Sequence, residues 1–242
     1  MTYLQSITEP IIKKTDYTAM WSNSFDTSNL TLGDISRLGQ IDNPLRFIGI
    51  ADEVPVKDYG GYENPLVIVH FGNATIWNPE QKTEEQWYGV FLQQKYYMNP
   101  AQKWNTRTGT PDITDAYGAG EVLAEAIPDY EYMEYIKTDY WGYQRMWIPS
   151  AAHVLPTGAH RFDYYADTSV YVARIASALS SAPTVAASCI GSYCVYATAV
   201  QTGYYYCSAS ASGVSGSTLN LASTNFYPRM CCFIKWNKVE ES

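Results

Sequence analysis

The side chains best suited to catalysis in this chain are its three histidines, His70, His153 and His160. Ser150 lies three residues before His153, a spacing that could bring a hydroxyl beside an imidazole. A hydrolytic triad also needs a carboxylate that orients the imidazole, and the local sequence assures none. His70 follows the apolar residues 66–69, so we expect a structural histidine at the end of a strand. We therefore assign no catalytic residue and expect a protein that is not an enzyme.

Metal ligands are too few for a complete site. His160, Asp163 and Asp167 have the i, i+3, i+7 spacing of one helix face, and such a face could hold a divalent ion. One imidazole and two carboxylates make only half of such a site, and a solvated face is the expected alternative. The glycine-rich stretches of the chain lack the Gly-Lys-Ser/Thr ending of a phosphate-binding loop. We therefore expect no metal and no cofactor.

The five cysteines all lie in the last third of the chain: Cys189, Cys194, Cys207, Cys231 and Cys232. The N-terminus lacks a basic region followed by an apolar core, so we expect no secretory leader. An odd cysteine count in that setting indicates free thiols. Cys231 and Cys232 are neighbours in a predicted strand and should point to opposite faces. We expect one core thiol and one surface or interface thiol.

Charge is distributed unevenly along the 242 residues. The net charge is −8, which argues against a nucleic acid partner and against an anionic membrane surface. No apolar stretch approaches the roughly 18 residues of a membrane span. No charged residue and no histidine occurs between Ile175 and Pro228. Disordered segments combine low hydrophobicity with high net charge, whereas this tract carries Val, Ile and Tyr at strand-like spacing, so we expect it to be folded.

The uncharged tract is rich in Tyr, Ser, Ala and Gly, and Tyr occurs 22 times in the chain. Tyrosine offers a large contact area at low rotamer cost, and small neighbours leave its ring accessible. The same composition suits a displayed binding face and an interface buried between subunits. The candidate contact residues are Tyr193, Tyr196, Tyr204, Tyr205, Tyr206, Ser208 and Ser210.

Local patterns predict the elements that would hold this tract. Strands are expected in residues 45–56, 64–72, 84–98, 192–200, 203–210 and 229–236, with a tight turn at 201–203. Helices are expected near 32–38, within 115–136 with a break at Pro128, and within 168–181. Runs of strands and helices in this order predict an α+β domain. Residues 1–44 are weakly patterned and form either an attachment or oligomerisation arm or a packed extension of the domain.

The order of several short motifs resembles a family of bacteria and phages with a C-type lectin-like fold, related to the formylglycine-generating-enzyme type. Trp104 stands at the family's Trp position, Ile127-Pro128 at its LP position, residues 147–150 (WIPS) at its LLS position, and residues 227–230 (YPRM) at its closing motif. The resemblance covers Leu45 to Trp236. The chain departs from it at residues 185–193, which lack the family's Trp and Arg. The resemblance implies a C-type lectin-like domain over residues 45–242, with short antiparallel strands and two to three helices, behind an arm of residues 1–44.

The same fold class includes the variable proteins of diversity-generating retroelements, which resemble this chain in ending with a Tyr/Ser-rich face at 188–217. The signature of calcium-dependent sugar-binding lectins is absent from the sequence. The resemblance implies a receptor-binding or adhesion protein of a phage virion, made in the host cytoplasm. Its partners would be a host cell-surface protein or glycan, other virion proteins through the arm, and further copies of itself. The alternative is a structural virion protein, such as a tail-tip, fibre or capsid decoration subunit, that uses the same face for assembly.

Overall fold

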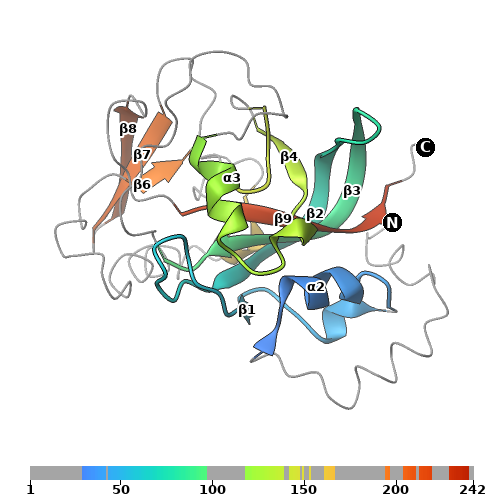
Figure 1. Ribbon diagram of the computed structural model, residues 1–242. Coiled ribbons are helices and arrows are strands. Elements are labelled where there is room, and N and C mark those ends of the chain that lie inside the picture. Colours follow the sequence, from blue (N-terminus) through green and yellow to red (C-terminus); the bar gives the residue numbers. More distant parts are fainter. Residues whose placement is uncertain are drawn as a thin grey trace.

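A six-stranded antiparallel sheet forms the centre of the part of the chain that the computed structural model describes (Figure 1). The described residues are 29–41, 43–96, 118–138, 142–147, 149, 153, 161–166, 194–196, 204–210, 213–219 and 229–239. The strand order is β5-β4-β2-β3-β9, and β1 pairs with β2 off this path. The strands are β1 (Glu53–Val54), β2 (Leu66–Asn78), β3 (Thr83–Gln94), β4 (Tyr135–Thr138), β5 (Gly142–Gln144) and β9 (Cys231–Lys238).

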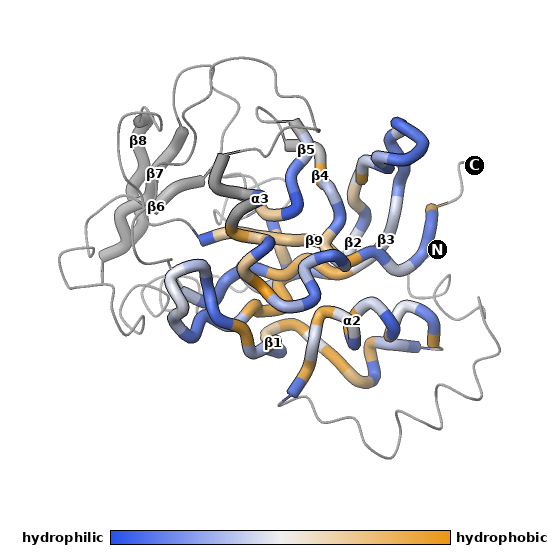
Figure 2. Tube along the Cα trace, viewed as in Figure 1, coloured by the Kyte–Doolittle hydropathy of each residue, from blue (hydrophilic) through white to orange (hydrophobic). Residues whose placement is uncertain are grey.

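The two longest strands of this sheet, β2 and β3, form a hairpin. Its register runs from Leu66 opposite Gln94 to Asn78 opposite Thr83. The Asn78 side-chain oxygen accepts hydrogen bonds from two main-chain amides of the turn, at 3.0 and 3.1 Å. Residues 66–69 of β2 are buried on both faces, as a continuous apolar run predicts, whereas the turn end is hydrophilic (Figure 2). The apolar half of the hairpin therefore lies in the core and the polar half reaches solvent.

Side chains alternate between the two faces of a strand, and both faces of the apolar part of the sheet are covered by other elements. On one face, Trp236 of β9 contacts Phe71 of β2, with ring centroids 5.7 Å apart. On the other face, Phe91 of β3 contacts Phe233 at 4.8 Å and Phe162 at 5.3 Å. The first face packs against helix α2 and the second against the short 3₁₀ helix η5 (Asp163–Tyr165).

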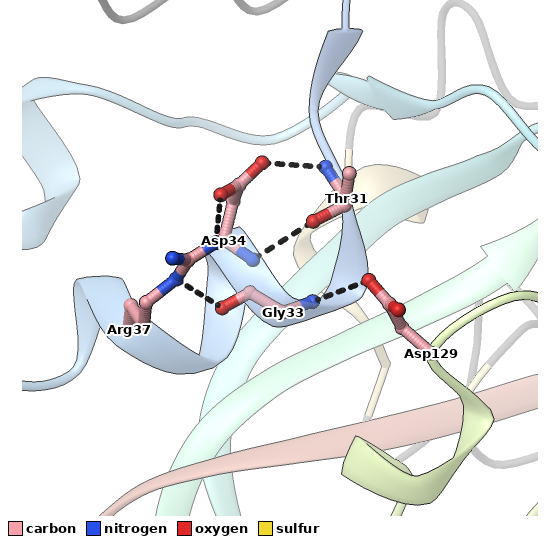
Figure 3. A network of polar contacts seen from close by, with 5 residues as sticks. All are labelled: Thr31, Gly33, Asp34, Arg37 and Asp129. Carbon is pink, nitrogen blue, oxygen red and sulfur yellow. Dashed lines mark hydrogen bonds and ion pairs between the residues drawn. The ribbon is translucent and has the colours of Figure 1, made fainter.

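Helix α2 (Leu32–Leu38) lies where the sequence predicts a short helix. It begins with a capping box, in which the Thr31 hydroxyl accepts from the Asp34 amide at 3.0 Å and Asp34 accepts from the Thr31 amide at 3.1 Å. Arg37 pairs with Asp34 at 2.7 Å one turn later. These contacts are all local to residues 31–37, as Figure 3 shows.

Tertiary contacts hold α2 against the sheet. Leu32, Ile35 and Leu38 are buried in the same core as β2, β3 and β9. The carboxylate of Asp129 accepts a hydrogen bond from the Gly33 amide at 3.4 Å, which joins α2 to the loop before the 3₁₀ helix η4 (Tyr130–Tyr132), as Figure 3 shows. Within the segment 1–44, residues 30–41 therefore pack as an extension of the core, and residues 1–28 lie outside the described part.

The other local predictions differ from the structure mainly in their boundaries. Of the strand expected in residues 45–56, only Glu53–Val54 pairs with β2, and residues 44–46 form the 3₁₀ helix η3 (Pro44–Arg46). The helix expected before Pro128 is α3 (Gly118–Glu125), and η4 follows the break. Leu123, Ala124 and Ile127 are buried in the core, whereas Ala126 is exposed. The helix expected within 168–181 lies outside the described residues.

In the described part of the chain, few helices accompany a mainly antiparallel sheet, so this part is of the α+β kind. Figure 1 shows α2 below the strands β2, β3 and β9, and the strand β9 crossing the molecule. β9 begins on the side of the view where a second, smaller sheet lies, and it ends near the opposite side. This second sheet contains most of the candidate contact residues.

Candidate functional site

The second sheet consists of three antiparallel strands: β6 (Cys194–Tyr196), β7 (Tyr204–Ser210) and β8 (Gly213–Leu219). β7 is the central strand, so it pairs with β6 on one side and with β8 on the other. None of the residues in these three strands is charged. In Figure 1 this sheet lies apart from the six-stranded sheet, on the side of the view opposite the end of β9.

Six of the seven predicted contact residues lie in this sheet. Tyr196 is on β6, and Tyr204, Tyr205, Tyr206, Ser208 and Ser210 are on β7. The seventh, Tyr193, lies outside the described residues. The strands expected at 192–200 and 203–210 are thus present as β6 and β7.

The register brings predicted contacts together across the strands. Tyr196 is directly opposite Tyr205, whereas Ser208 is opposite Ser215 on β8, a residue outside the predicted set. Alternate positions of a strand belong to the same face, so 204, 206, 208 and 210 form one series on β7, and 205 belongs to the other together with its partner 196. The predicted contact residues therefore divide between two faces of the small sheet.

A buried polar network stands at the start of β9, where the chain returns from the small sheet. The Arg229 side chain is 3 % exposed, and its Nε donates to the main-chain oxygen of Gln94 at 2.6 Å. Its Nη1 donates to the hydroxyl of Tyr165 at 2.6 Å. The Met230 amide donates to the Gln94 side-chain oxygen at 2.9 Å. These bonds join β9 to the end of β3 and to η5.

Tyr165 and Gln93 complete this network. The Tyr165 hydroxyl donates to the Gln93 side-chain oxygen, and the Gln93 amide donates to the main-chain oxygen of Arg229 at 3.3 Å. Tyr165 is fully buried, and Gln93 is 2 % exposed. Buried polar groups are costly unless they are hydrogen-bonded, so a network of this kind permits few alternative arrangements. The network therefore fixes residues 229 and 230, at the start of β9, to the end of β3 and to η5.

A second polar cluster connects α3 to β4 and β5. The Glu121 carboxylate accepts from Arg145 at 3.0 Å and from the Tyr135 hydroxyl at 3.2 Å. The Arg145 guanidinium also lies 4.6 Å from the ring centre of Tyr135 and 5.2 Å from that of Tyr130. Burial raises the pKa of Glu121, although Arg145 acts in the opposite direction. This cluster ties the helix to the edge of the sheet.

Two of the three histidines, His70 and His153, lie with Phe162 and Asp163 in an arrangement that sequence spacing did not predict. His70 Nδ1 lies 2.9 Å from Asp163 Oδ2, so an Asp–His pair links β2 to η5. Phe162 stacks on His70 at 5.6 Å and on His153 at 4.8 Å between ring centroids. His70 is in the middle of β2, beside an irregularity in the register, rather than at a strand end. Its role as a satisfied structural histidine agrees with these contacts.

The structure describes only some of the residues that sequence spacing suggested for hydrolysis or for metal binding. Ser150, His160 and Asp167 lie outside the described residues, so their distances from His153 and Asp163 are not part of the structure. Asp163 instead pairs with His70. Within the described ranges, no group of three or more His, Cys, Asp and Glu side chains is arranged to hold a metal ion.

The expectation of one core thiol and one surface or interface thiol at Cys231 and Cys232 is wrong. Both cysteines are fully buried and unpaired. They do alternate between the two faces of β9, but α2 covers one face and the aromatic cluster around Phe91 covers the other. Burial raises the pKa of both thiols, that of Cys231 strongly. They pack as small apolar side chains.

Two features of the site were missed by sequence reasoning. Strand β8 is rich in Gly and Ser, which are poor strand formers, so only its position after β7 could have indicated it. Arg229 is the first charged residue after the long uncharged tract. A lone arginine between an aromatic motif and an apolar strand was the available signal for a buried, hydrogen-bonded guanidinium.

Comparisons with known proteins add no relative. No protein-family model, no curated protein and no solved structure matches the chain. Among the described residues, no helix is long and apolar enough to cross a membrane.

Proposed function

We propose that this chain is a receptor-binding or adhesion protein of a phage virion, and that the sheet of β6, β7 and β8 is its binding face. The observation that carries the proposal is the composition of that sheet, which combines tyrosines with small uncharged residues and no charge. Neutral tyrosine-rich surfaces lose little on desolvation and make large contacts at low entropic cost. Its ligand is a host cell-surface protein or glycan.

The scaffold supports a presented face of this kind. Both faces of the six-stranded sheet are already covered, so the small sheet is not needed to close that part of the core. The buried network around Arg229 anchors the chain where β9 begins. A rigid scaffold that carries a neutral, tyrosine-rich sheet is the arrangement expected of a C-type lectin-like display protein, and we include that fold in the proposal. In it, residues 1–28 contact other virion proteins, and the protein forms homo-oligomers.

The two faces of the small sheet provide a sharp test. The full-length protein, fluorescently labelled, is incubated with a panel of bacterial cells and with a glycan array. One variant carries Tyr204→Ala and Tyr206→Ala, and a second carries Tyr196→Ala and Tyr205→Ala. We expect one of these variants, which alter opposite faces, to lose binding by about 30-fold or more, the size of a hot-spot loss. Equal binding by both variants and wild type contradicts the proposal.

A matched control comes from the scaffold. Tyr59 and Tyr62 are 50 % and 37 % exposed in the loop between β1 and β2. The Tyr59→Ala, Tyr62→Ala variant removes the same number of tyrosines and should bind as wild type does. If this control loses as much binding as the sheet variants do, the binding is a non-specific effect of exposed tyrosines and does not depend on the small sheet.

The same variants distinguish the alternative function, a tail-tip, fibre or decoration subunit. If the small sheet is an assembly interface, the variants change the oligomeric state measured by analytical ultracentrifugation, and the wild type binds none of the cells or glycans. If the sheet binds a receptor, the oligomeric state stays constant while binding is lost. The two functions therefore give opposite results in two independent measurements.

A further inference from the structure

Cys194 on β6 and Cys207 on β7 are direct cross-strand partners. Directly opposite residues of an antiparallel pair have Cα atoms about 4.5 or about 5.5 Å apart, depending on the kind of pair. Both separations fall within the range of roughly 4.4–6.8 Å that disulfides span. We propose that Cys194 and Cys207 form a disulfide bond that fastens β6 to β7. The proposal gives these two residues a specific pairing, where the odd cysteine count of the chain indicates free thiols.

The other described cysteines have no such partner. Cys231 and Cys232 are consecutive residues of β9, are fully buried and are unpaired. Consecutive positions of a strand belong to opposite faces, so these two thiols do not face each other. Among the four cysteines that the structure describes, only Cys194 and Cys207 are therefore opposite each other on neighbouring strands.

The bond would supply something that the small sheet needs. Register is strongly specified where one face of a sheet is buried and apolar, and weakly specified in polar or Gly-rich strands. β8 is Gly- and Ser-rich, and β6 is an edge strand of only three residues. A shift of one residue would move every position of β6 to the other face relative to β7. A covalent link at 194–207 prevents that shift and keeps Tyr196 opposite Tyr205.

The functional importance of a fixed β6–β7 register rests on the proposed function, because the register decides which residues lie on the face that binds the ligand. The disulfide itself does not depend on that function. The chemistry is thiol–disulfide exchange with a low-molecular-weight disulfide such as oxidised glutathione. One cysteine thiolate attacks the glutathione disulfide and releases one glutathione thiol. The second cysteine thiolate then attacks the mixed disulfide and releases the other, so two protein thiols are oxidised while one glutathione disulfide is reduced.

Peptide mapping of the full-length protein tests the pairing directly. The protein is equilibrated in glutathione buffers of increasing oxidised fraction, unfolded, alkylated and digested. Trypsin is unsuitable because no Lys or Arg lies between 175 and 228, which would keep Cys189, Cys194 and Cys207 on one peptide. Chymotrypsin cuts after Tyr196 and Tyr206 and separates the two partners. The expected product is a Cys194–Cys207 cross-linked peptide that disappears on reduction, with Cys231 and Cys232 alkylated.

Alkylation of both Cys194 and Cys207 at the most oxidising ratio overturns the proposal, as does a link from either residue to Cys189.

Hydrogen exchange supplies the second readout. Oxidation should slow amide exchange in β6 and in residues 205–207 of the wild type, and of a Cys189→Ser control, but not of Cys194→Ser or Cys207→Ser. A cross-link that leaves exchange in β6 unchanged overturns the role in register. Both measurements are made without any ligand, so their outcome is separate from that of the binding test.

Discussion

The indole Nε1 of Trp236 on β9 donates a 2.7 Å hydrogen bond to the main-chain oxygen of Ile35 on α2, a residue 201 positions earlier in the chain. The last four carbonyl groups of an α-helix lack partners within the helix, and Ile35 is one of these four residues in α2. The last strand thus caps the first described helix. Both residues are buried, and the ring of Trp236 also packs on Phe71 and Tyr88 of the sheet.

Replacing Trp236 with Phe should destabilise the protein. The variant keeps an aromatic ring but leaves the buried Ile35 oxygen without this donor, which costs about 1–3 kcal/mol of unfolding free energy. Urea denaturation followed by circular dichroism measures the change. Trp87→Phe is the control, because the Trp87 indole donates to the nearby Glu85 side chain in a less buried position, and its loss should cost clearly less.

Gly39 tests how closely α2 approaches β9. A Cβ atom at Gly39 would lie 2.5 Å from Trp236 Cδ1 and 2.9 Å from its Cα, too close for any side chain. We expect Gly39→Ala to lower the unfolding free energy by about 1–3 kcal/mol, the usual cost of overpacking. At Gly49 a Cβ would meet nothing within 4 Å, so Gly49→Ala should have little effect. Equal stability of the two variants would contradict the close packing of α2.

The buried network at Arg229 predicts a large effect for the loss of one hydroxyl. Tyr165→Phe removes the group that accepts from Arg229 and donates to Gln93. The remaining buried polar groups lose a partner, which costs about 1–3 kcal/mol. Tyr132→Phe, at a ring that is 40 % exposed, is the matched control for removing a tyrosine hydroxyl. Similar unfolding curves for the two variants would argue against the network as an anchor of β9.

Alkaline pH should destabilise the fold through Tyr88. Burial raises the pKa of Tyr88 to about 12 from its ordinary value of 10.0, with a smaller contribution from Asp163. Since the folded protein holds this proton more tightly than the unfolded chain does, the stabilising contribution is complete below pH 10.0 and is lost as pH rises through about 12. The Tyr88→Phe variant should therefore lose stability less steeply over this interval. Chemical denaturation at several pH values, with Tyr59→Phe as control, measures the slopes.

The two thiols of β9 should be protected in the native protein. Because the thiolate is the reactive form and burial raises the pKa of Cys231 and Cys232, iodoacetamide at pH 8 should leave both unmodified until the protein is unfolded. Peptide mass spectrometry after labelling in native and in denaturing buffer measures the protection. Rapid labelling of either cysteine in the native state would contradict its burial and support the surface or interface thiol expected from the sequence.

Elements with a strong local pattern were predictable. Helix α2 has its cap and first turn within residues 31–37, so its signals are contained in a few neighbouring positions. The apolar runs of β2 and β9 likewise predict buried strands. The α+β class follows from the order of these elements. The boundaries were less accurate, as at β1, where two residues pair out of the twelve expected at 45–56.

The sequence by itself determined which segments are apolar enough to be strands and which tract is free of charge, because these properties belong to residues close together in the chain. Only the tertiary structure decided that both faces of β9 are covered, that Asp163 pairs with His70, and that Cys194 stands opposite Cys207. Each of these depends on segments brought together from distant positions. A local pattern specifies the direction of a side chain relative to its own strand, but burial and partners are set by what packs on that strand from elsewhere.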